Sequence, residues 1–115
     1  MGARLTILDE HRNEIFYGSK LYGYVSPIQD CESLKYLWAI KDEWGGNEYS
    51  DYDDFCWYMD VLPEHISIKL SLSQLDTYLE LYDADLCSFE LDDYIQEEVE
   101  AALPEGINNV LLEWG

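Results

Sequence analysis

The sequence predicts an α+β fold: a small antiparallel sheet with about four short helices, folded as a single compact domain over residues 1–115. Stretches in which apolar and polar residues alternate lie near both ends of the chain and once in its middle, and segments of helical period separate them. A hydrophobic content of 48%, with ten Tyr, four Trp and three Phe, is enough for a core. A disordered acidic chain would be poor in these residues.

An antiparallel hairpin or meander is expected at the start of the chain. Apolar and β-branched residues alternate over 5–7 and again over 15–17, and the polar segment "DEHRN" at 9–13 predicts a turn between them. A further short strand is expected over 21–24. These stretches together predict two or three strands that pair locally.

A helix is expected next, because inward-facing positions recur at every third or fourth residue. They are Leu34, Leu37, Trp38 and Lys41. The glycines at 45–46 end this helix.

A second helix is expected over 47–60, and it ends at Pro63. Ser50 is the expected N-cap, with Asp53 placed three residues on as in a capping box. Its inward-facing residues are expected to be Phe55, Tyr58, Met59 and Leu62.

The second half of the chain predicts a strand, two helices and a final strand. The strand covers 65–71, and Ser71 or Ser73 is expected to cap the helix that follows it. The last strand covers 107–114. The two helices have apolar stripes at Leu75, Tyr78, Leu79 and Tyr82, and at Leu91, Ile95, Val99 and Leu103.

The net charge is −19, from 25 acids and six bases. No base follows Lys69, although twelve acids do. Solubility alone needs a charge of only about 2–8, so the excess predicts a cationic partner, a bound ion or a high-salt habitat. A bare nucleic acid or an anionic membrane would repel the chain, and the longest apolar runs are too short to span a bilayer.

Residue types with metal-binding or catalytic chemistry are sparse. Cys31, Cys56 and Cys87 are odd in number and widely spaced, which is typical of reduced thiols in a cytoplasmic protein. We expect core thiols rather than zinc ligands, because no Cys or His pair has the short spacing of zinc sites. No stretch fits a calcium loop, a phosphate-binding loop or a nucleophile motif. The chain is therefore expected to be no enzyme and to need no metal or cofactor.

The segment "NEYSDYDDFCWYMD" at 47–60 combines five acids with five aromatic rings. Acids four apart on a helix lie about 5–6 Å from one another, whereas DNA carries a phosphate about every 3.4 Å along each strand. A folded acidic surface can therefore resemble a row of phosphates. The candidate carboxylates are Glu48, Asp51, Asp53, Asp54 and Asp60, and in a second cluster Asp83, Asp85, Glu90, Asp92, Asp93, Glu97 and Glu98.

Aromatic side chains beside these acids would add rigid contact area and stacking surfaces for partner arginines. The candidates are Tyr49, Tyr52 and Trp57. The alternative, that Tyr52 and Trp57 pack on neighbouring helices, remains open from the sequence.

The stretch "ESLKYLWAIKDEWGGNEYSDYDDFCWYM" (32–59) resembles small acidic anti-CRISPR proteins of phages, which inhibit a type II-A CRISPR nuclease by mimicking DNA. Plasmid antirestriction proteins, also DNA mimics, have a similar acidic segment. The resemblance implies that carboxylates at 48, 51, 53 and 54 meet the Arg and Lys that otherwise bind DNA. The matching positions are Glu32, Ser33, Trp44, Glu48, Tyr49, Asp51, Asp53, Asp54, Phe55 and Met59.

The expected function is thus a non-enzymatic inhibitor in the host cytoplasm, which occupies the DNA-binding cleft of a basic nuclease and binds neither nucleic acid nor membrane itself. One alternative is an immunity protein that neutralises a basic toxin nuclease. Another is an acidic phage protein that self-associates, for example as a homodimer, and a third is adaptation to high salt.

Overall fold

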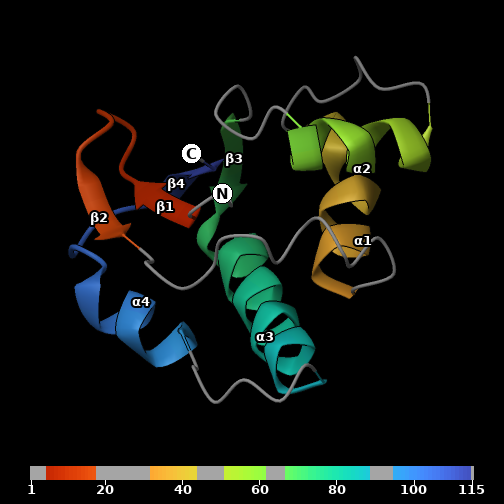
Figure 1. Cartoon of the computed structure of the whole chain (residues 1–115). Coiled ribbons are helices and arrows are strands. Elements are labelled where there is room, and N and C mark those ends of the chain that lie inside the picture. The colour runs from red at the N-terminus through yellow and green to blue at the C-terminus, as the bar shows by residue number, and fades with distance from the viewer. Residues whose placement is uncertain (1–4, 18–31, 44–50, 62–66, 89–94, 115) are drawn as a thin grey trace.

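The computed structural model describes residues 5–17, 32–43, 51–61, 67–88 and 95–114 (Figure 1). It confirms the predicted α+β class and the small antiparallel sheet. The further strand expected over 21–24 lies outside the described residues. In chain order the elements are β1 (Leu5–Leu8), β2 (Glu14–Tyr17), α1 (Glu32–Ala39), the 3-10 turn η1 (Lys41–Glu43), α2 (Tyr52–Val61), β3 (Ser67–Ser71), α3 (Leu72–Ser88), α4 (Gln96–Ala102) and β4 (Asn109–Trp114).

The four strands form one antiparallel sheet in the order β2-β1-β4-β3. The last strand of the chain thus lies between the first strand and β3. Directly paired residues share a face of the sheet, so the partners Ile7, Leu112 and Ile68 point to the same side. This inner face has no solvent exposure at Ile7, Ile68, Leu70, Val110 and Leu112.

The turn between β1 and β2 is organised by Asp9, as the polar segment at 9–13 predicted. Its Oδ1 accepts the backbone N–H groups of His11 and Asn13, each at 2.8 Å. The N–H of Asn13 above all holds the pKa of Asp9 below its ordinary value of 3.8. Arg12 has a φ of 65° and forms an ion pair with Glu113 on β4.

The helices pack around the inner face of the sheet (Figure 1). Helix α3 contacts β3 and β4 on one side and α1 on the other, α4 contacts α3 and β2, and α2 packs on α1. The predicted inward-facing residues of α3 are confirmed as buried: Leu75, Tyr78, Leu79 and Tyr82.

Helix α3 is capped by Ser71, one of the two cap residues that the sequence predicts, and the cap is a capping box with Gln74, which was not predicted. The backbone N–H of Gln74 donates to Ser71 Oγ at 3.3 Å, and the N–H of Ser71 donates to Gln74 Oε1 at 3.0 Å. Two backbone donors at the helix start are thus satisfied reciprocally. The Gln74 side chain also donates to Glu43 in η1, which connects the start of α3 to the end of α1.

The N-cap of α2 is Asp51, so the prediction of Ser50 was wrong. Asp51 Oδ1 accepts the backbone N–H of Asp54 at 2.8 Å, and the Asp51 carbonyl accepts the N–H of Phe55. The pattern is therefore shifted by one residue, with Asp54 rather than Asp53 at the third helical position. A carboxylate is also a better acceptor than a hydroxyl at the positive end of a helix dipole.

On its inner side α2 buries Phe55, as predicted, and Cys56, which is a core thiol. Trp38 of α1 packs against Phe55, with ring centroids 5.7 Å apart. The side chains of Tyr58, Met59 and Leu62 lie outside the described residues, as do those of Cys31 and Cys87.

Helix α4 begins on a carboxylate that another helix provides. Asp83 of α3 accepts the backbone N–H of Ile95 at 2.8 Å and that of Gln96 at 3.1 Å, one on each oxygen. The residue at the N-cap of α4, Ile95, has no side-chain acceptor of its own. Asp83 is only 7% exposed, so its expected place in an acidic surface cluster was wrong. Ile95 and Val99 are buried in the predicted stripe and Leu103 is half-buried, while Leu91 lies outside the described residues.

Candidate partner-binding surface

The described bases are already matched by acids close to them. Arg12 pairs with Glu113, and the Nζ atoms of the lysines lie 3.7–3.9 Å from carboxylate oxygens. Each of these pairs lies on the sheet, its first turn, α1 or η1, whereas α2, α3 and α4 contain no Lys or Arg. The lysine pairs are Lys35 with Glu32, Lys41 with Asp42 and Lys69 with Glu10. Charge is therefore least compensated on the surface of these three helices.

The outer face of α2 combines a carboxylate with an exposed ring. Asp53 is exposed and forms no ion pair with the described bases. Trp57, four residues on, is 53% exposed. Residues four apart lie on the same side of a helix, so the acid and the indole form one patch. This pair, Asp53 and Trp57, is called the α2 patch below.

Three other residues predicted for this site do not belong to the α2 patch: Asp51, Tyr52 and Asp54. The carboxylate of Asp51 caps the helix, and Asp54 is half-buried. Tyr52 is half-buried against Trp38, with ring centroids 5.9 Å apart and the planes inclined by 68°. The alternative of packing on a neighbouring helix is therefore confirmed for Tyr52, whereas more than half of the Trp57 surface is exposed.

The rest of the predicted site is described only in part. Glu97 and Glu98 are exposed on α4. Seven predicted side chains lie outside the described residues: Glu48, Tyr49, Asp60, Asp85, Glu90, Asp92 and Asp93. The structure thus brings Asp53 and Trp57 together but does not place the two predicted clusters relative to one another.

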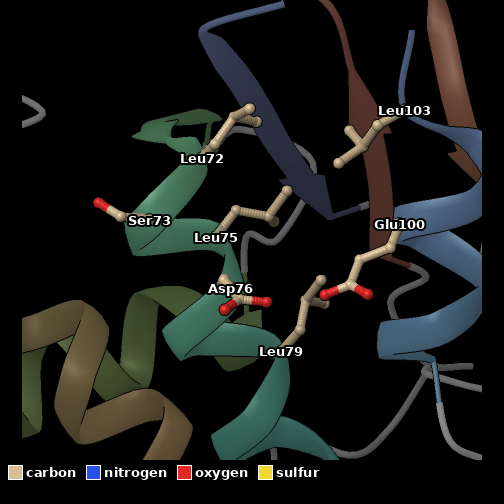
Figure 2. A pocket seen from close by; sticks show the side chains of 7 residues that line it. All are labelled: Leu72, Ser73, Leu75, Asp76, Leu79, Glu100 and Leu103. Carbon is tan, nitrogen blue, oxygen red and sulfur yellow. The ribbon is translucent and has the colours of Figure 1, made fainter. Parts of the chain in front are cut away.

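A pair of carboxyl groups between α3 and α4 was missed from the sequence. Asp76 of α3 and Glu100 of α4 point toward one another (Figure 2). Gln96 Nε2 donates to Asp76 Oδ1 at 2.8 Å and holds that side chain in place. The pKa of Glu100 is raised above its ordinary value of 4.5, first by a hydrogen bond with Asp76, then by burial and by repulsion from Asp76 and Glu97. The sequence holds no sign of this pair, because the two acids are 24 positions apart.

Replacing Glu100 by glutamine should flatten the dependence of stability on pH. The folded protein binds a proton at Glu100 more tightly than the unfolded chain does, so this group lowers the free energy of unfolding as pH rises from about 4.5 through the raised pKa. Glutamine keeps a donor for Asp76 and removes the repulsion. Urea unfolding between about pH 4 and pH 7 should show the variant gaining stability over the wild type as pH rises.

The matched control is Glu98→Gln, which removes the same charge from an exposed position on the same helix. Its stability difference from the wild type should change less with pH than that of Glu100→Gln. Equal pH dependence of the two variants would show that the contact with Asp76 does not matter.

Within the described ranges, His, Cys, Asp and Glu side chains form no group of three that could hold a metal ion. No helix of the described part is both long and apolar enough to cross a membrane. The chemistry that remains on these surfaces is that of carboxylates and exposed aromatic rings.

Comparisons with known proteins give no match: no protein family model, no curated protein and no solved structure is similar to this chain. The resemblance to anti-CRISPR proteins therefore stays a prediction.

Proposed function

We propose that this protein is a non-enzymatic inhibitor that mimics DNA and occupies the DNA-binding cleft of a basic nuclease in the host cytoplasm. The nuclease is a CRISPR effector or a restriction enzyme. Carboxylates on the helical surface, with Asp53 at the centre, take the place of DNA phosphates. Trp57 beside it stacks on an arginine of the cleft.

The observation that carries this proposal is the distribution of the bases. The described bases pair with acids on the sheet, α1 and η1, and none lies on α2, α3 or α4. A solvated surface with an ordinary acid bias would have bases spread among its acids. A surface that must fit a basic cleft has to exclude them, because each base would face a like charge.

The local structure of α2 supports the same proposal. The Asp51 cap and the packing of Phe55 and Cys56 in the core fix the orientation of the helix. Its outer face is therefore ordered before any partner binds, so little conformational entropy is lost on association. A rigid ring next to a charge is also typical of residues that dominate binding energies.

The test is a competition experiment with two purified nucleases, a guide-loaded type II CRISPR effector and a type I restriction enzyme. The chain alone should leave duplex DNA unshifted in a low-salt gel, because like charges repel. It should displace DNA from one of the nucleases, and more of it should be needed as the DNA concentration rises. A direct shift of DNA by the chain would contradict the proposal. Binding to the nuclease without displacement of DNA would contradict it too, and would favour the immunity-protein alternative.

A further inference from the structure

A groove with an apolar floor runs between α3 and α4 (Figure 2). Leu75 and Leu79 form its floor and are each 1% exposed, while the half-buried Leu72 and Leu103 form its walls. Its volume of about 350 Å³ lies near the lower end of the range of roughly 300–1,000 Å³ found for ligand sites. None of its lining residues belongs to the α2 patch.

The rim of this groove is acidic. Asp76 and Glu100 lie on its two sides and point toward each other. The pKa of Glu100 is raised, first by its hydrogen bond with Asp76, then by burial and by the repulsion that arises when both carboxylates are ionised. Repulsion from Glu97 raises the pKa of Glu100 further. The side chain of Gln96 donates a hydrogen bond to Asp76 but carries no charge. A cation placed between the two carboxylates would remove the repulsion.

The described part of the chain does not supply this cation itself. Its Arg and Lys side chains pair with acids on other elements, and neither α3 nor α4 contains a base. An occupant that fits the groove is cationic at one end, to meet the carboxylates, and apolar along its length, to cover the leucines.

Arginine has this shape. Its methylene stem packs on apolar surface while the charged group stays at the rim. Its planar guanidinium offers donors on two edges and can bond to two carboxylates at once, whereas a lysine ammonium is a compact, strongly hydrated charge.

We propose that the groove between α3 and α4 binds an arginine side chain of a protein partner, with its stem on Leu75 and Leu79 and its guanidinium between Asp76 and Glu100. This goes beyond the proposed DNA mimicry, because the site is separate from the α2 patch and recognises a side chain rather than a phosphate-binding cleft as a whole. The two proposals can succeed or fail independently.

The test is an NMR titration of the full chain with four blocked amino acids, each acetylated at the N-terminus and methylamidated at the C-terminus. The arginine compound should shift the amide signals around Asp76, Gln96 and Glu100. The citrulline compound keeps the shape without the charge and should bind at least about tenfold more weakly, since a hydrogen bond to a charged group is stronger than a neutral one. The lysine compound should bind more weakly than arginine, and the norleucine compound, which has only the stem, should not saturate.

Substitutions in the chain locate the site. Asp76→Asn and Glu100→Gln preserve the shape of the groove and should each weaken arginine binding by about tenfold or more. The matched control is Glu80→Gln, which removes the same charge one turn from Asp76 at an exposed position outside the groove. Its effect should stay within about twofold.

A groove-filling variant, Leu103→Phe, retains every charge and should abolish binding while circular dichroism shows that the fold survives. Three outcomes would overturn the proposal: equal binding of arginine and citrulline, equal loss in Glu80→Gln and the groove variants, or wild-type affinity in a folded Leu103→Phe protein.

Discussion

Replacing Asp83 by alanine should lower the free energy of unfolding by about 2–4 kcal/mol. Its carboxylate accepts the N–H groups of Ile95 and Gln96 at 2.8 and 3.1 Å and is nearly buried. Hydrogen bonds to a charged group contribute roughly 1.5–3 kcal/mol each, and the removal of a buried charge offsets part of that. The melting temperature should fall by roughly 10 °C.

Two further variants distinguish the loss of the hydrogen bonds that cap α4 from the loss of a negative charge on α3. Asp83→Asn keeps one acceptor oxygen and should lose less stability than alanine does. Glu80→Ala removes an exposed acid of the same helix and should change stability by no more than about 0.5 kcal/mol. Hydrogen exchange should show faster exchange at the N–H of Val99, which bonds to the Ile95 carbonyl in the first turn of α4. A loss below about 0.5 kcal/mol in Asp83→Ala would mean that the apolar stripe alone holds α4 in place.

The features predicted correctly depend on neighbours in the sequence. Ser71, one of the two predicted caps of α3, bonds with Gln74 only three residues on, although the reciprocal bond from Gln74 was not predicted. The β1–β2 turn depends on Asp9 and Asn13, four residues apart. The buried stripe of α3 and the buried Leu34 and Leu37 of α1 follow from helical periodicity. The predicted end of the first helix at the glycines was wrong, because α1 ends at Ala39 and Lys41 lies in η1.

The features missed depend on contacts that no local pattern encodes. Alternation predicts a strand at 107–114 but does not say that β4 lies between β1 and β3. The cap of α4 is provided by Asp83, twelve residues before Ile95, so an acid assigned to the surface is buried. Asp76 and Glu100 meet only because α3 and α4 pack side by side.

The position of Asp51 changes how the α2 site must be tested. The sequence suggests reversing the charge at Asp51, Asp53 and Asp54 together. The structure shows that Asp51 caps α2 through its bond with the N–H of Asp54, so its loss would cost about 1 kcal/mol in stability. A loss of binding in the triple variant would then have two causes. Asp53 and Trp57 are exposed and have no such role in capping.

Asp53→Lys combined with Trp57→Ala should weaken binding to the nuclease by about hundredfold or more, since buried aromatic residues at an interface dominate affinity and a reversed charge repels the basic cleft. Surface-based kinetics should separate the two contributions. Asp53→Lys should mainly slow association, and Trp57→Ala should mainly accelerate dissociation. The matched control is Glu105→Lys, which makes the same change of charge in the exposed turn before β4, on the side of the molecule away from α2 (Figure 1).

Added salt should slow association with the nuclease, as Asp53→Lys should. Raising the ionic strength from about 0.1 M to about 1 M shortens the Debye length from about 10 Å to about 3 Å, so the association rate of the wild type should fall by at least about tenfold. Its dissociation rate should change less, because the stacked ring of Trp57 carries no net charge and is buried in the complex. In Asp53→Lys the same change of salt should slow association less than in the wild type, whereas Glu105→Lys should keep more of the wild-type response. An association rate indifferent to salt would show that the charge of −19 does not bring the chain to its partner. Self-association would then be the better explanation of the acidic surface.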